Sequence, residues 1–277
     1  MNLSKNFLIK CAGCLLAVAA LAITTSCAWM EGDLLDLSGG EPADITIDQL
    51  YQRMSAATDP EGVYAKAKSY RLIQEVESVD GNSKNRDYYS TVVLFKQPDF
   101  IKQVSLRNGI PFSMILFRDG SAWNIDPRTK KSQKLPEGTG LNLIKTFSDM
   151  LKPGNNYKTI FQDVQIDVSY SEGRKYYRLI CRVADPAIAP YVFYIDAETY
   201  LTRKLETVLY SNDGAGSRSL YVAISEDYEW ISGVKMPRRS RITVNGKTDI
   251  SKLISFTLNP DLPDSEFSVT QPWNYDK

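Results

Sequence analysis

The sequence predicts a single α+β domain: one long antiparallel sheet that curls toward a barrel, with two helices available to plug its mouth. From Ser69 onward, apolar and polar residues alternate over about eleven short segments, the pattern of β-strands. Hairpin-length turns such as Asn108-Gly109 and Asp119-Gly120 separate many of them. Two further segments show the three-to-four-residue apolar spacing of helices. A sheet with so many strands is too long to stay flat, so we expect it to curve.

Residues 1–26 are predicted to be a secretory signal. Lys5 and Lys10 precede an apolar stretch over residues 11–23, which is too short to span a membrane. Small residues then lead to Cys27, as in a bacterial lipobox, although Thr24 stands where leucine is usual. We therefore expect cleavage before Cys27 and a diacylglycerol on its sulfur. The alternative is ordinary cleavage nearby, which would leave Cys27 free or remove it.

Residues 27–45 are expected to form a lipidated N-terminus and a flexible tether, because glycine, proline and acids dominate the segment. The folded domain is expected over residues 46–277. It begins with a capping box at Thr46 and Gln49, followed by an apolar stripe from Ile47 to Met54, which predicts a helix. A second helix is predicted over residues 141–152, with Thr139 as its cap.

The strands are expected on both sides of the second helix. In the C-terminal half, the first strand is expected to carry Ile160, Val164, Ile166, Val168 and Tyr170 largely on one face. The other predicted strands cover residues 70–79, 88–96, 100–106, 112–118, 122–125, 176–183, 191–195, 201–210, 219–225, 240–244 and 253–258.

Composition excludes several classes of function. Lysine plus arginine equals aspartate plus glutamate at 33 each, a balance that does not suit nucleic-acid binding. The chain has no histidine, so it lacks the commonest general base and metal ligand, and we expect no metal and no cofactor. Beyond the signal and Cys27, the one thiol is Cys181, which is expected to be buried and inert. A glycosidase-like carboxylate pair remains an alternative that sequence alone does not remove.

Several motifs resemble the LolA/LolB superfamily of lipoprotein carriers. They are a strand ending in Lys96-Gln97-Pro98, an Asp119-Gly120 turn, a strand with Trp123, and an Asp126-Pro127 turn. Later segments, including Asn259-Pro260 and the residues after it, are similar to larger lipoproteins of the same superfamily. The resemblance covers roughly residues 46–270 in order.

This resemblance implies an unclosed, strongly curved β-barrel whose apolar concave face is lidded by helices and binds acyl chains. The residues expected to line the cavity and lid are Phe95, Trp123, Ile144, Phe147 and Leu151. The alternative is that these side chains form a closed core with no space inside.

The chain departs from the soluble carrier at one position. The carrier has an arginine before the proline that helps gate the lid, whereas this sequence has Gln97, an uncharged side chain with fewer donors. A lipid-anchored acceptor therefore fits better than an arginine-latched carrier. Acceptors also present an apolar residue on a hairpin tip, and the matching residue is Ile110, which would contact the membrane or fold back onto the sheet.

The resemblance thus implies a monomeric, non-enzymatic protein on the periplasmic side of a membrane that binds a lipid acyl chain or a lipoprotein. Ala28 after Cys27 gives a preference for the outer membrane, because the aspartate that retains some lipoproteins at the inner membrane is absent there. The alternative is a periplasmic sensor or scaffold that uses the same sheet to bind a protein partner in the cell envelope.

Overall fold

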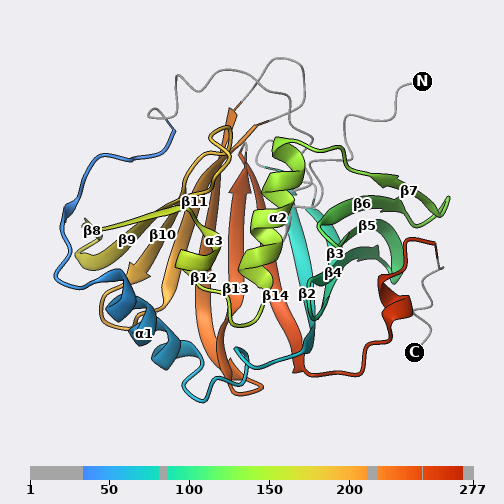
Figure 1. The fold of residues 1–277 in the computed structure, drawn as a ribbon, viewed down its shortest axis with the longest axis horizontal. Helices are drawn as coiled ribbons and strands as arrows, with labels where there is room; N and C mark the ends of the chain where they lie inside the picture. Colours follow the sequence, from blue (N-terminus) through green and yellow to red (C-terminus); the bar gives the residue numbers. More distant parts are fainter. Residues whose placement is uncertain (1–33, 81–85, 211–217, 245, 271–277) are drawn as a thin grey trace.

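The computed structural model describes residues 34–80, 86–210, 218–244 and 246–270, and its main feature is one strongly curved antiparallel sheet (Figure 1). Fourteen strands follow the order β1-β8-β9-β10-β11-β12-β13-β14-β2-β3-β4-β5-β6-β7. Within the described chain, β1 pairs only with β8 and β7 only with β6, so the sheet stays open at both edges. The prediction of an unclosed, strongly curved sheet with helices is confirmed.

The sheet consists of two meanders. The N-terminal meander contains β2 (Ser69–Asp80), β3 (Arg86–Lys96), β4 (Phe100–Arg107), β5 (Ile110–Arg118), β6 (Ser121–Asp126) and β7 (Lys131–Lys134). The C-terminal meander contains β8 (Asp163–Ser171), β9 (Arg174–Arg182), β10 (Tyr191–Asp196), β11 (Thr202–Tyr210), β12 (Arg218–Ile231), β13 (Val234–Val244) and β14 (Lys247–Leu258). Pairing of β2 with β14 joins the two meanders, with Tyr70 opposite Leu258.

This topology explains why helices cover the concave face. The chain leaves the first meander at β7 on one edge and enters the second at β8, near the other edge. The connection carries α2 (Thr139–Leu151) and α3 (Tyr157–Ile160), and Figure 1 shows both helices in front of the sheet. The crossing therefore places the apolar stripe of α2 against the sheet interior.

Helix α1 (Ile47–Thr58) begins as predicted. The Thr46 hydroxyl accepts from the Gln49 backbone N–H at 3.2 Å, and the Gln49 side chain accepts from the Thr46 N–H at 2.9 Å. Ile45 and Leu50, on either side of the cap, are both buried in the main core. No helix in the described part of the chain is both long and apolar enough to cross a bilayer.

The structure corrects three local predictions. The sheet contains two strands that the pattern does not predict, β7 and the two-residue β1 (Glu41–Pro42). Each of them pairs only at one edge of the sheet. Ile160 belongs to α3 rather than to a strand, because Asn156 caps this short helix through the backbone N–H groups of Lys158 and Thr159. Helix α2 has Gly138 at its N-cap, without a side-chain hydrogen bond, so Thr139 is its first residue and not its cap.

The main hydrophobic core lies on the concave side, and the convex face has two smaller cores. One convex core is covered by the C-terminal segment, which includes the 3-10 helix η2 (Asp264–Phe267) and buries Phe267 completely. Lys102 holds this segment by donating to the Glu266 carbonyl at 2.5 Å, and burial lowers the pKa of Lys102 to about 8. The C-terminal end of the described chain is therefore part of the fold.

The other convex core is covered by residues 34–44, which we name the N-terminal strap. Leu35 is 1% exposed and packs with Ile180 and Val192, and Glu41–Pro42 pairs with β8. A flexible tether was expected over residues 27–45, but residues 34–44 of this segment are packed on the sheet. Gly40 lies where the strap crosses β8, and a Cβ there would approach the Val168 carbonyl to 2.2 Å, so only glycine fits.

Candidate functional site

The strongest candidate site is an open cavity of about 540 Å³ at the end of the sheet where α1 lies, which we name the mouth cavity. Helix α1, the loop after it, the C-terminal end of α2, and α3 surround it. Its apolar and aromatic walls are formed by Tyr51, Met54, Tyr64, Met150, Tyr157, Ile160 and Phe193. Because several of these side chains also pack on the main core, the cavity borders the apolar interior.

Contacts at the mouth hold α1 and α2 differently. Helix α1 is joined to α3 by an ion pair between Asp48 and Lys158 at 2.5 Å, in which both side chains are more than half exposed. Such exposed pairs contribute little to stability. The C-terminal end of α2 is fixed more firmly, because the Tyr64 and Tyr70 hydroxyls both donate to the Leu151 carbonyl, at 2.8 and 3.2 Å. The loosest polar link at the mouth is therefore the one between α1 and α3.

Three of the predicted lid residues belong to α2, and their side chains fill the space between this helix and the sheet. Ile144, Phe147 and Leu151 are each at most 3% exposed and belong to the main core. The Phe147 ring meets Tyr191 edge-on, with the ring centroids 5.7 Å apart at 84°. In this arrangement the helix itself occupies the region where a hollow was expected, and the open volume lies at the mouth.

The structure places Phe95 and Trp123 on opposite faces of the sheet. Phe95 is buried on the concave face and stacks on Tyr70, with centroids 5.2 Å apart. Trp123 packs against the convex core with the C-terminal segment, while its neighbour Ala122 belongs to the concave core. The expectation that Trp123 lines the concave cavity does not fit this position, since adjacent residues of a strand point to opposite faces.

Gln97 lies beside the C-terminal end of α2 but does not bond to it. It borders a second cavity of about 480 Å³ with Phe95, Lys152 and Asn155. Its side-chain amide donates instead to the Ala67 carbonyl at 3.3 Å, and its backbone N–H donates to the Lys68 carbonyl at 2.8 Å. In this structure Gln97 therefore fastens the segment before β2.

The remaining predicted positions fall outside the mouth. Ile110 is at the tip of the β4–β5 hairpin and is 67% exposed. Cys27 lies outside the described residues. Cys181 is fully buried, and burial raises the pKa of its thiol far above the ordinary value, as expected for an inert core cysteine. No group of histidine, cysteine, aspartate or glutamate that could hold a metal occurs among the described residues.

Sequence reasoning missed most of the mouth cavity. Tyr51 and Met54 lie on the predicted stripe of α1, so their position near the interior could be anticipated. Tyr157 and Ile160 could not, because α3 was not predicted and Ile160 fitted the alternation of a strand.

The open, curved antiparallel sheet with helices over its concave face defines a half-barrel fold. No protein-family model and no curated protein matches the sequence. Among solved structures, the fold is similar to a LolA superfamily protein from Nitrosomonas europaea, with a TM-score of 0.55, 15% identity, and coverage of 81% of this chain and 98% of that one. The chain therefore has a LolA-like fold.

Two further structures support the same fold. A putative outer membrane lipoprotein-sorting protein domain from Vibrio parahaemolyticus aligns with a TM-score of 0.51 at 12% identity, covering 80% of this chain and 97% of that one. A DUF1329 family protein from Desulfovibrio piger aligns with a TM-score of 0.52 at 12% identity, covering 80% and 99%.

Proposed function

We propose that the protein is a lipid-anchored component of the bacterial cell envelope that shelters the acyl chain of a lipid or lipoprotein beneath its helices. The observation that carries this proposal is the mouth cavity, whose apolar walls continue into the core of the curved sheet. Its volume of about 540 Å³ lies within the roughly 300–1,000 Å³ of typical ligand sites. The LolA-like fold, which a lipoprotein-sorting domain shares, supports the same class of ligand.

Binding would rest on apolar burial without covalent chemistry. Each methylene removed from water contributes about 0.8 kcal/mol, so a long acyl chain gains enough to leave a membrane. To bury more of the chain, α2 would pivot about its C-terminal end, where Tyr64 and Tyr70 hold it. The acyl chain would then replace Ile144 and Phe147 against the same apolar wall.

The anchor and location are part of the proposal. A diacylglycerol on Cys27 would hold the protein on the periplasmic side of a membrane, and Ala28 favours the outer one. An exposed Ile110 would touch that membrane during transfer of the lipid.

The test is native mass spectrometry of the protein purified from membranes, followed by lipid extraction. We expect a stoichiometric acyl lipid in the wild type and its loss in Met54→Glu, which places a charge on the mouth wall. Gln52→Glu is the matched control, because it adds the same charge at an exposed position of α1. Lipid-free wild-type protein, or equal lipid content in both variants, would contradict the proposal.

A scaffold function is the second candidate, and a groove on the convex face favours it. The groove has a volume of about 670 Å³ and carries Glu75, Tyr88, Arg239 and Lys252, charges of both signs beside an exposed aromatic ring. Such a surface suits a protein partner. A lipid-free protein recovered with a stoichiometric envelope protein, and released by Tyr88→Ala, would favour this function.

A further inference from the structure

The concave face changes from apolar to polar along several neighbouring strands. On β2, Tyr70 and Leu72 near the α1 end are 1% exposed and belong to the main core, and the next inward residue is Gln74, at 6% exposed. On β4, the inward residue Ile101 is followed by Gln103. On both strands the inward-facing residues nearest the mouth are therefore apolar, and a buried glutamine follows them, although Val76 beyond Gln74 is apolar again.

The register of the sheet brings these polar residues side by side. Thr91 lies opposite both Gln74 and Ser105, and Ser251 lies opposite Ser240. We name this surface the polar band, and its members are Gln74, Thr91, Gln103, Ser105, Ser113, Ser240 and Ser251. All seven are at most 6% exposed.

Some atoms of the polar band are buried without a hydrogen-bond partner. They are the side-chain carbonyl oxygens of Gln74 and Gln103 and the hydroxyl of Ser251. Leaving such a group unpaired costs about 1–3 kcal/mol, and folded proteins contain few of them. Three such atoms on one wall leave hydrogen-bonding positions unfilled, and the two amide oxygens among them can only accept hydrogen bonds.

The charge near the polar band restricts its ligand. The band itself contains no ionisable residue. On the same face of the sheet, the carboxyl group of Asp249 lies two residues before Ser251 on β14 and is 6% exposed. A buried carboxylate disfavours an anionic group nearby.

We propose that the polar band binds the neutral, donor-rich head of an amphiphile whose acyl tail lies along the apolar half toward the mouth. The head would carry hydroxyl or amide N–H groups, as in an acylglycerol, and it would enter first. This inference rests on the proposed function, because it names the kind of acyl lipid that the interior accepts. It predicts a preference between two lipids with the same tail.

The test compares monopalmitoylglycerol with methyl palmitate, which has the same chain but no donor. Affinities are measured with the full chain by displacement of a dansyl-labelled fatty acid. We expect the wild type to bind monopalmitoylglycerol about tenfold more tightly, the equivalent of one or two buried hydrogen bonds. Gln74→Met and Gln103→Met, which keep the volume, should each lower that preference about threefold to fivefold while methyl palmitate binds as before.

The controls separate a specific polar contact from a general loss of fold. Leu253→Met changes the apolar half beside Gln74 and should affect both lipids alike. Ser251→Ala removes an unpartnered hydroxyl with little change in volume and should reduce the preference in the same direction if a glutamine variant fails to fold.

The outcomes distinguish this inference from the proposed function. Equal affinity of the wild type for both lipids, or equal losses for both lipids in Gln74→Met and Ser251→Ala, would overturn the polar band and leave acyl binding intact. If neither lipid displaces the dansyl probe and the probe itself does not bind, both proposals fail.

Discussion

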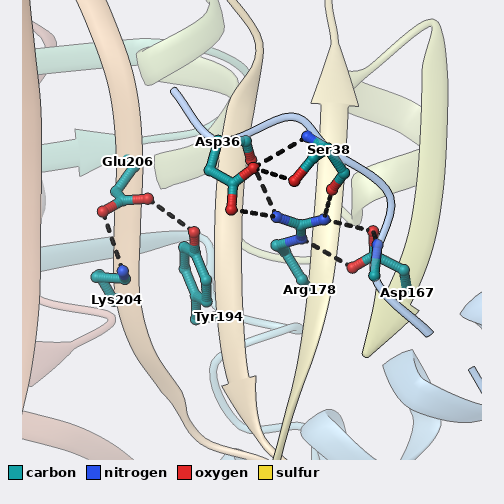
Figure 2. Close-up of polar contacts among 8 residues, drawn as sticks. Asp36, Ser38, Asp167, Arg178, Tyr194, Lys204 and Glu206 are labelled. Atoms are coloured by element: carbon teal, nitrogen blue, oxygen red, sulfur yellow. Dashed lines mark hydrogen bonds and ion pairs between the residues drawn. The ribbon is translucent and has the colours of Figure 1, made fainter. Parts of the chain in front are cut away.

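Arg178 and Asp167 form a two-point ion pair on the convex face, with Nε and Nη2 of the arginine 2.8 and 2.7 Å from the two carboxylate oxygens. The Arg178 side chain is 3% exposed, and its remaining donors reach the carbonyls of Asp36 and Ser38 in the N-terminal strap. Figure 2 shows the guanidinium group between the strap and Asp167. The hydrogen bonds to Asp167 raise the pKa of Arg178 further, although burial opposes the shift, so Arg178 stays charged. Arg178 thus fastens the strap to β8 and β9.

The first prediction concerns this fastening. Arg178→Lys keeps the charge but replaces the planar guanidinium group with a smaller ammonium group. The lysine cannot donate hydrogen bonds to Asp167 and to both strap carbonyls at the same time. We expect a loss of about 2 kcal/mol in the free energy of unfolding and faster proteolysis within the strap. Urea denaturation and limited proteolysis measure the two effects. Arg182→Lys is the control, because its pair with Asp163 is largely exposed and should matter little. Equal behaviour of the two variants would refute the role of Arg178.

The second prediction concerns the side chain that fills the space beneath α2. Phe147→Ala should lower the free energy of unfolding by about 3 kcal/mol or more, because a buried ring is lost and a cavity remains. The same variant should bind the dansyl-labelled fatty acid more tightly, since the ring no longer competes for the apolar wall. Lys145→Ala, at an exposed position of the same helix, should change neither quantity. A Phe147→Ala protein that is destabilised but binds no more probe would argue against acyl binding beneath α2.

The third prediction concerns the pH dependence of stability. Burial raises the pKa of Asp249 from 3.8 to about 6 in the folded protein, although hydrogen bonds from Ser78 and Tyr89 and the charge of Lys247 oppose the shift and that of Asp87 adds to it. Between about pH 4 and 6 the unfolded chain has released a proton that the folded chain keeps, so this carboxyl makes stability fall as pH rises through that window.

Asp249→Asn removes this effect. We expect it to raise the free energy of unfolding by about 2 kcal/mol at pH 7 and to leave it almost unchanged at pH 4. Urea denaturation at the two pH values measures the difference, with exposed Asp261→Asn as the control. A gain of the same size at both pH values would show that ionisation of Asp249 is not the cause.

The fourth prediction concerns the hairpin tip. Ile110→Ser should slow lipid transfer between the protein and vesicles severalfold without changing stability, because the side chain is 67% exposed and has little packing to lose. Transfer is followed by fluorescence of a dansyl-labelled lipid. Ile254→Ser, at an exposed position on β14, is the control. An unchanged transfer rate in Ile110→Ser would show that Ile110 has no role at the membrane.

The sequence predicted the elements better than their assembly. Alternation located most strands, apolar stripes located both long helices, and the capping box located the start of α1, because those signals are local. The contact of β2 with β14 is not local, and it decides that the chain must cross the concave face between β7 and β8. The face of the sheet on which Trp123 lies also could not be predicted from local signals. The pattern around it fits either face, and only the pairing of β6 with β5 turns Ala122 inward and Trp123 outward.

The N-terminal strap was missed because its composition is that of a linker. Gly39, Gly40 and several acids favour a loose chain, yet Gly40 is the residue that permits the close crossing of β8. The available signal was the pair Leu35 and Leu37, two residues apart as on a strand and facing the same convex core. The candidate site was predicted only in part, because its walls come from α1, α3 and β10, whose meeting depends on the crossing.

The pairing of Tyr70 with Leu258 also sets the order in which the molecule is completed. This pairing joins β2 to β14, the last strand among the described residues, so it cannot form until β14 has been made. A nascent chain on the ribosome therefore has no finished half-barrel before β14 has been made. Synthesis that stops before β14 yields two separate meanders with exposed edges, a product that quality-control proteases can remove.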